Sequence, residues 1–371
     1  MTPWPDVPVV EAFRDATGGN AKVPATEYLA SGLYPVIDQG NSDVAGYTNE
    51  RERLCRTQGP VVLFGDHTRA FKYVDRRFAL GADGVKVLAP REGWDTKYLY
   101  WALRSLDLPS AGYSRHFKFL KERSIARPPI QEQRKIAAIL DQADTLRGKR
   151  RESIAHLDVL ARAAFMETFG DPLSNPRDLP IQLLDAWVDP DRPVTYGILK
   201  PGPDVADGVP YVRVADMRAG GIALPRVKRT STAIALQYKR STLQAGDLLI
   251  SIRGHVGRMA EVPAALDGAN ITQDSARLAV DCDSVEYVRG ALECESVQAW
   301  MARRVRGAAV QGLNLGDLRL VPLPLPPLRE LQDFGRLART IRCRREVARR
   351  QLVECDALAA SLAHHAFTGD L

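Results

Sequence analysis

Cysteine is scarce in this sequence, and long apolar runs are missing. The cysteines form no C-x-x-C pair and their number is odd, which argues against a zinc motif or a disulfide framework; they are Cys55, Cys282, Cys294, Cys343 and Cys355. No apolar run of about 18 residues occurs, and the start MTPWPDVPVV lacks the basic and apolar regions of a signal peptide. We therefore expect a cytoplasmic protein with reduced thiols and no membrane span.

Motifs of common catalytic sites are missing as well. There is no G-x-x-x-x-G-K-[ST] phosphate loop, no H-E-x-x-H zinc motif and no G-x-S-x-G nucleophile motif. The [DN]-P-P-[YF] tetrapeptide of amino-methyltransferases is absent, because Arg127 and Leu325 precede the two Pro-Pro pairs. Asp95-Thr96-Lys97 could be half of a metal-dependent nuclease site, but the upstream Pro5-Asp6 is far away. We expect no catalytic centre and no metal site in this chain.

The bulk composition leaves room for two domains and favours a polyanionic partner. The chain has 371 residues, of which 45% are hydrophobic and 26% charged, so it can bury more than one core. Its formal net charge is +6 and its pI about 9.1. Cationic side chains that neutralise phosphates release condensed counterions, so this balance suits nucleic acid.

A long segment of the sequence occurs twice. Residues 128–171 and 326–370 superimpose at a shift of 198 positions (326 minus 128), which places Pro128-Pro129 on Pro326-Pro327 and Phe169 on Phe367. Both copies begin after a proline pair and close on an aromatic residue, glycine and aspartate. They could be two unrelated amphipathic helices of one large domain, but the shared length, entry and exit favour a duplicated unit.

Both copies have the pattern of a long helix. Proline is tolerated just before a helix, and none follows within either copy. Apolar residues recur in steps of three and four, as in a coiled-coil seam, and Arg147 and Arg345 interrupt the two seams at matching places. A helix of about 40 residues is roughly 60 Å long, and each could cover the apolar stripe of the other. The seam residues are Ile136, Leu140, Ile154, Leu157, Leu331, Phe334, Ile341, Leu352 and Leu362.

The segment before each helix is rich in glycine, proline and short β-prone runs. In the first segment, strands are expected near 34–37, 60–64 and 84–88, followed by a short helix at 94–106. In the second, strands are expected at 210–214 and 246–254, followed by a helical stretch at 284–304. The sequence therefore predicts two copies of one unit, which consists of an α+β domain followed by a long helix.

Polar and basic residues gather in the expected turns of both segments. Lysine and arginine neutralise phosphates, while arginine, asparagine and glutamine can distinguish guanine or adenine in the major groove. Isolated histidines at these turns are more often turn or hydrogen-bonding residues than metal ligands. The candidate DNA-binding residues are His67, Arg69, Lys72, Arg76, Arg115, Lys118, Arg253, His255, Arg258, Arg303, Arg304, Gln311 and Asn314.

The layout resembles the specificity subunit of type I restriction–modification systems over essentially the whole chain. The second helix departs from this pattern: it reads PPLRELQDFGRLA and lacks the Glu-Gln pair of the first. The motifs that carry the resemblance are YPVIDQG at 34–40, LFGDHT at 63–68, FKYVD at 71–75, PPIQEQRKIAAILDQAD at 128–144, FGDPLSNP at 169–176, GDLLISIRGHVG at 246–257, GANITQDSARL at 268–278 and the terminal FTGDL.

The resemblance implies two target-recognition domains, at 1–129 and 172–327, and two spacer helices, at 130–171 and 328–371. The helices would pack as an antiparallel coiled coil, and each domain would read one half of a bipartite double-stranded DNA site. The resemblance also implies partners: two methyltransferase subunits and motor–endonuclease subunits, which would hold S-adenosylmethionine, ATP and Mg²⁺, while this chain would bind no cofactor.

Three alternatives stay open at the level of sequence. A methyltransferase or nuclease acting alone would need motifs that the sequence lacks. A coiled-coil scaffold that binds only proteins would show no affinity for DNA that falls with salt. A subunit of a modification-only or related phage-defence system would share the fold and differ only in its partner genes.

Overall fold

The computed structural model describes residues 4–81, 84–110, 114–218, 220–307 and 311–368. The chain forms two compact units, and each long helix contributes to both of them. The first unit consists of Met1–Glu152 with Arg349–Leu371, and the second of Ser153–Ala348. Within the described residues, no helix is both long and apolar enough to cross a membrane.

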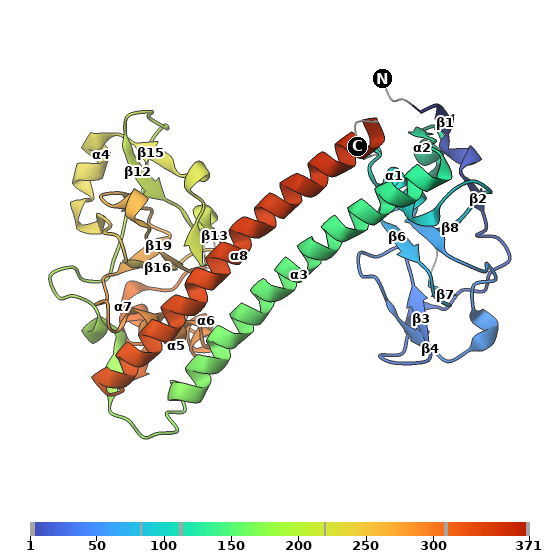
Figure 1. Ribbon diagram of the computed structural model, residues 1–371. Helices are drawn as coiled ribbons and strands as arrows, with labels where there is room; N and C mark the ends of the chain where they lie inside the picture. Colours follow the sequence, from blue (N-terminus) through green and yellow to red (C-terminus); the bar gives the residue numbers. More distant parts are fainter. Residues whose placement is uncertain (1–3, 82–83, 111–113, 219, 308–310, 369–371) are drawn as a thin grey trace. The chain divides into compact units, whose positions relative to one another are not determined.

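The two expected long helices are present and begin where the proline pairs predict. Helix α3 spans Ile130–Phe169 and helix α8 spans Leu328–Thr368, drawn in green and red in Figure 1. Helix α3 ends at Gly170, whose φ of 75° suits glycine and whose N–H donates to the Met166 carbonyl at 2.9 Å. The matching glycine and aspartate after α8, residues 369–370, lie outside the described residues.

The two helices run in opposite directions and pack on each other within each unit. In the first unit, Arg147 Nε donates to Asp356 Oδ1 at 2.6 Å. In the second, Arg345 Nη1 donates to Asp158 Oδ1 at 2.8 Å. The shift of 198 positions carries Arg147 onto Arg345 and Asp158 onto Asp356, so the repeat forms the same ion pair twice. The α+β class and the antiparallel pairing of the long helices are thereby confirmed.

In the described residues of the first unit, the globular part contains a four-stranded sheet, a three-stranded sheet, a strand pair and two short α-helices. The four-stranded antiparallel sheet has the order β2-β8-β5-β6, and the three-stranded sheet β4-β3-β7 pairs β3 with β7 in parallel. The first and last strands, β1 and β9, form a separate pair. The bounds are β1 Asp6–Pro8, β2 Phe13–Asp15, β3 Tyr34–Ile37, β4 Gly46–Thr48, β5 Val61–Gly65, β6 Phe71–Val74, β7 Ala79–Leu80, β8 Val85–Pro90, α1 Thr96–Arg104, α2 Phe117–Lys121 and β9 Ser124–Ala126.

The second unit repeats this topology with additions. Its sheets are β11-β19-β16-β17 and β15-β12-β18, the latter again with one parallel pair, and β10 pairs with β20. The hairpin β13-β14 and helices α4 and α6 are additional. The bounds are β10 Ile181–Leu183, β11 Thr195–Tyr196, β12 Val209–Val212, β13 Met217–Arg218, β14 Gly221–Ile222, β15 Lys228–Thr230, α4 Thr232–Gln237, β16 Leu248–Ser251, β17 Met259–Glu261, β18 Asn270–Ile271, β19 Ser275–Leu278, α5 Val285–Glu293, α6 Glu295–Ala302, α7 Leu315–Arg319 and β20 Pro322–Pro324.

One expected element differs from the structure. The helical stretch predicted at 284–304 is two helices, α5 and α6, because Cys294 adopts an extended conformation with φ −61° and ψ 139°. That break follows from the backbone at a single residue, which the apolar periodicity does not reveal.

A buried tyrosine marks the same place in both units. Tyr98 Oη donates to the Ala126 carbonyl at 2.8 Å, and Tyr287 Oη donates to the Pro324 carbonyl at 2.6 Å. Burial raises the pKa of both phenols, so they remain donors. The Phe367 ring lies 5.9 Å from the Tyr98 ring, and the Phe169 ring lies 4.9 Å from the Tyr287 ring.

These contacts show that the two halves of the chain are interlocked. We call residues 1–171 the first half and 172–371 the second half. Phe169 closes the helix of the first half and packs into the globular segment of the second, while Phe367 does the reverse. The predicted seam residues divide by burial: Ile136, Leu140, Leu331, Phe334 and Ile341 are buried, and Ile154, Leu157, Leu352 and Leu362 are half-buried.

Replacement of Phe169 tests this interlocking. Its ring is 4% exposed and contacts Phe165, Tyr287 and Phe334. We expect Phe169→Ala to lower the free energy of unfolding by about 3–5 kcal/mol, because it leaves a cavity among aromatic rings. Val159→Ala, at an exposed position of the same helix, serves as the control and is expected to change stability by about 0.5 kcal/mol or less. Chemical denaturation measures both, and equal losses would contradict the assignment.

Candidate nucleic-acid interface

In the first unit, two loops that are distant in the sequence lie against each other. The turn after β5, residues 66–70, contacts Leu108 and the residue pair His116-Phe117. Arg69 Nη1 donates to the Leu108 carbonyl at 3.0 Å, and the His116 N–H donates to the Asp66 carbonyl at 2.8 Å. The Phe117 N–H also donates to Asp66 Oδ1 at 2.8 Å. The structure thus joins the two basic clusters that the sequence places in the first segment.

The second unit joins its two clusters in the same manner. The turn after β16, residues 252–258, contacts Gly312 and Leu313. Arg253 forms an antiparallel bridge with Gly312, and the Leu313 N–H donates to the Ile252 carbonyl at 2.8 Å. Because β16 corresponds to β5 and α7 to α2, the two units place their paired loops at equivalent positions of the repeated fold.

Left-handed backbone shapes both turns. Arg69 has a φ of 62°, which is uncommon outside glycine, and the hydrogen bond from its guanidinium to Leu108 holds the turn against the second loop. In the second unit, Gly254 and Gly257 adopt φ values of 70° and 89°. Such turns at the end of a buried strand expose side chains on a rigid support.

Most candidate DNA-binding residues are at the surface. Several half-buried ones are held by neighbours: Arg253 donates to Gln273 Oε1 at 2.9 Å, and Arg258 donates to the Met217 carbonyl at 3.2 Å. Arg304 lies over the Trp300 ring, 3.5 Å from its centroid. The exposed candidates are Arg69, Arg76, Arg115, Lys118, His255, Arg303, Gln311 and Asn314, and the half-buried ones are His67, Arg253, Arg258 and Arg304.

Two candidates stand apart from the paired loops. Lys72 is 8% exposed and donates from Nζ to the Asp38 and Ser42 carbonyls, at 2.8 and 2.6 Å. Burial lowers the pKa of Lys72, and its ammonium holds the loop after β3 in place. Arg76 follows β6 and lines a cavity together with Arg51. We therefore leave both residues out of the proposed interface.

Two glutamines join the loops without having been singled out from the sequence. Gln39 Oε1 accepts from the His67 N–H at 3.2 Å, and the Gln39 carbonyl accepts from Thr68 Oγ1 at 2.6 Å. Gln273 holds Arg253 in the second unit. Each lies beside an aspartate just after a short strand, as Asp38-Gln39 and Gln273-Asp274. That pattern was the available signal, but only folding brings these amides to the loops.

Replacement of Lys72 tests its structural role. We expect Lys72→Met to lower the free energy of unfolding by about 1–3 kcal/mol, because two carbonyls that Nζ satisfies lose their donor. Arg76→Met, which removes an exposed cation four residues further along the chain, is expected to change it by about 0.5 kcal/mol or less. Urea titrations measure both; a neutral Lys72→Met would show that the side chain is dispensable for the fold.

Two curated relatives match parts of the chain, whereas no protein-family model matches it. The specificity subunit of the type I restriction enzyme EcoBI from Escherichia coli is 29% identical over 202 residues, which cover 53% of this chain and 42% of that subunit. The EcoR124I/EcoR124II specificity subunit from Escherichia coli is 32% identical over 87 residues, covering 23% of this chain and 22% of that subunit. The matches thus span less than half the length of either relative.

Two solved structures share the fold along the entire chain. The type I restriction–modification S subunit from M. genitalium superimposes with a TM-score of 0.66 at 15% identity, covering 99% of both chains. A chain from a study of complex assembly and conformational transition in a type I restriction–modification system gives 0.51 at 18% identity, covering 100% of this chain and 99% of that one. Sequence identities this low support a shared fold and no more. Sequence and fold together confirm that the chain is similar to the specificity subunits of type I restriction–modification systems.

Proposed function

We propose that this chain reads DNA sequence on behalf of partner enzymes, with each globular segment recognising one half of a bipartite site. The observation that carries the proposal is the pairing of two polar, basic loops at equivalent positions in both units. A fold that presents the same kind of loop surface twice within one chain suits a target with two elements at fixed separation.

The two loop surfaces differ in their side chains, so the two half-sites should differ in sequence. The first carries His67, Arg69, Arg115 and Lys118, and the second carries Arg253, His255, Gln311 and Asn314. Cations position the backbone, whereas the amides of the second surface match the donor and acceptor pattern of adenine. We infer an asymmetric site.

The chemistry is assigned to partner subunits. We propose that the chain has no catalytic centre and that two methyltransferase subunits, and motor–endonuclease subunits, supply S-adenosylmethionine, ATP and Mg²⁺ in the cytoplasm. Two pairs of apolar residues at positions related by the repeat support a duplicated docking surface: Ile139 with Leu337, exposed to 37% and 46%, and Leu160 with Leu358, exposed to 50% and 54%. A surface that occurs twice can receive the same partner twice.

The direct test is a methylome comparison. The chain is expressed with the modification subunit of its own genome, and sequencing that detects methyladenine is compared with a strain that lacks this chain alone. A bipartite methyladenine motif that disappears with the chain supports the proposal. An unchanged methylome, together with no salt-sensitive DNA affinity in the purified complex, would favour a protein-binding scaffold instead.

Substitution in one loop surface should affect one half-site. We expect Arg253→Ala with His255→Ala to weaken or relax the half of the motif read by the second unit, because both residues lie in its turn, His255 exposed and Arg253 half-buried against Gln273. The reciprocal pair, Arg69→Ala with Arg115→Ala, should affect the other half. Methylome sequencing of both variants measures this, and loss of both halves at once, or of neither, would contradict the assignment of one half-site to each unit.

Lengthening both helices should lengthen the unread spacer. Seven residues inserted after Glu152 and seven after Arg350, positions related by the repeat, add about 10 Å to each helix and keep its apolar face in phase. Since base pairs rise by about 3.4 Å, we expect a spacer about three base pairs longer with both half-sequences unchanged. An unaltered spacer would show that the helices do not set the separation. A seven-residue insertion in the exposed 202–207 segment of the second unit is the control.

A further inference from the structure

The two short helices that receive the ends of the long helices are aligned by their buried tyrosines. Helix α1 reads TKYLYWALR and helix α5 reads VEYVRGALE, with Tyr98 on Tyr287. Around these shared tyrosines, Trp101 stands where α5 has Gly290, and Arg104 stands where α5 has Glu293. The faces of α1 and α5 that contact the long helices therefore share the buried tyrosine and differ at the two neighbouring positions.

The contacts that the two units share cannot tell one half from the other. Each half carries an arginine, an aspartate and a terminal phenylalanine for the other half to bind: Arg147, Asp158 and Phe169 in the first, and the equivalent residues in the second. These residues would serve equally well if two copies of the same half came together. Any preference for unlike halves must come from positions that differ.

At one such position, the short helix and the long helix differ in side-chain size, and the difference is reversed between the two units. In the second unit, a Cβ added to Gly290 would lie 2.4 Å from the Phe165 ring, so the ring occupies the space that a side chain on α5 would need. In the first unit the equivalents are Trp101 on α1 and Ala363 on α8, and both belong to the same hydrophobic cluster. The large residue is on the long helix in one unit and on the short helix in the other.

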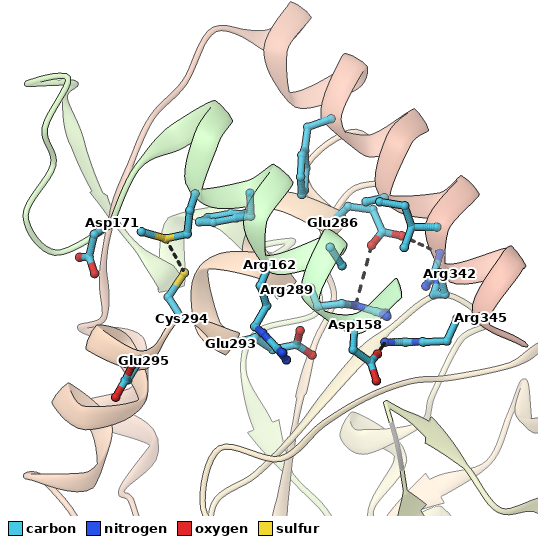
Figure 2. A pocket seen from close by; sticks show the side chains of 17 residues that line it. Asp158, Arg162, Asp171, Glu286, Arg289, Glu293, Cys294, Glu295, Arg342 and Arg345 are labelled. Atoms are coloured by element: carbon cyan, nitrogen blue, oxygen red, sulfur yellow. Dashed lines mark hydrogen bonds and ion pairs between the residues drawn. The ribbon is translucent and has the colours of Figure 1, made fainter. Parts of the chain in front are cut away.

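The charge of the side chains one turn away also differs between the two units. Figure 2 shows Arg162 of α3 beside Glu293 of α5, and the two side chains line a cavity of about 410 Å³ together with Phe165 and Gly290. In the first unit, the residues at the equivalent positions are the uncharged Ala360 and the cationic Arg104, whose guanidinium lies 5.1 Å from the centroid of the Trp101 ring. At this pair of positions the long helix is basic where the short helix is acidic, and uncharged where the short helix is basic.

We propose that these positions make the pairing of a first half with a second half more stable than the pairing of two first halves or of two second halves. Two first halves would press Phe165 against Trp101 and bring Arg162 to Arg104, an overpacked and like-charged contact. Two second halves would set Ala363 against Gly290, enlarging the existing cavity, and would remove Arg162 from the cations around Glu293, leaving Arg289 and Arg345. The shared contacts supply the strength of the pairing, and the differing contacts select the partner.

The inference goes beyond sequence reading and does not rest on it. The end of α3 is a surface for the second globular segment and not for another copy of the first. Two first halves, or two second halves, such as those of two fragments of the chain, are therefore disfavoured by the packing itself. The pairing of a first half with a second half brings two different globular segments together.

The test uses the full chain and exchanges the helix ends. Variant E carries Arg162→Ala, Phe165→Ala, Ala360→Arg and Ala363→Phe, so that each globular segment meets the end suited to the other. Variant EF adds Trp101→Gly, Arg104→Glu, Gly290→Trp and Glu293→Arg, which exchanges the receiving faces too. The control exchanges two exposed residues related by the repeat, Ala163→Ser with Ser361→Ala.

We expect variant E to melt about 10 °C below the parent chain, variant EF to recover at least half of that loss, and the control to match the parent within about 1 °C. Helical circular dichroism on heating measures all three. Should variant E fail to fold, recovery of a folded, soluble variant EF still supports the proposed selectivity for unlike halves. A variant E as stable as the parent, or a variant EF no better than variant E, overturns the proposal.

Discussion

The structure depends on the burial of an apolar stripe along each of two long helices. A helix of 40 residues such as α3, with charged residues on most of its surface, gains most of its stability from what covers that stripe. The pairing of α3 with α8 supplies the cover, and the ion pairs Arg147–Asp356 and Arg345–Asp158 allow one register. The globular segments then close over the helix ends, each with the ring of a phenylalanine from the opposite half. Every other feature, the paired loops included, is positioned from this frame.

Much of the frame could be predicted from the sequence, because its causes are local or repetitive. Proline pairs and heptad spacing placed α3 and α8 closely, and apolar runs between glycines placed β5 and β16. Short strands such as β1 and β7 were missed, since their pairing partners lie far along the chain: Asp6 pairs with Ala126. Strands of two or three residues carry too little periodicity to be recognised from the sequence.

The candidate interface could be predicted only in part, for the same reason. The basic clusters were visible, but their meeting depends on bonds such as His116 to Asp66, 50 residues apart. Lys72 was misleading because alternation along β6 decides whether a side chain faces the solvent or the loop beneath it. The ion pairs from the short helices to the long helices have opposite polarity in the two units: Lys97 of α1 binds Asp141, whereas Glu286 of α5 binds Arg342. This reversal can likewise be recognised only when the helices are aligned in space.

The division of the chain into units has a consequence for its synthesis. The second unit is continuous from Ser153 to Ala348, whereas the first needs both ends of the chain. On the ribosome, all residues of the second unit emerge before Leu362, Ala366 and Phe367, which complete the core around Tyr98. The amino-terminal segment, although made first, therefore acquires its full core only after all residues of the second unit have been made, and until then its apolar core is incomplete. Chaperone binding and premature termination would act on this part of the nascent chain above all.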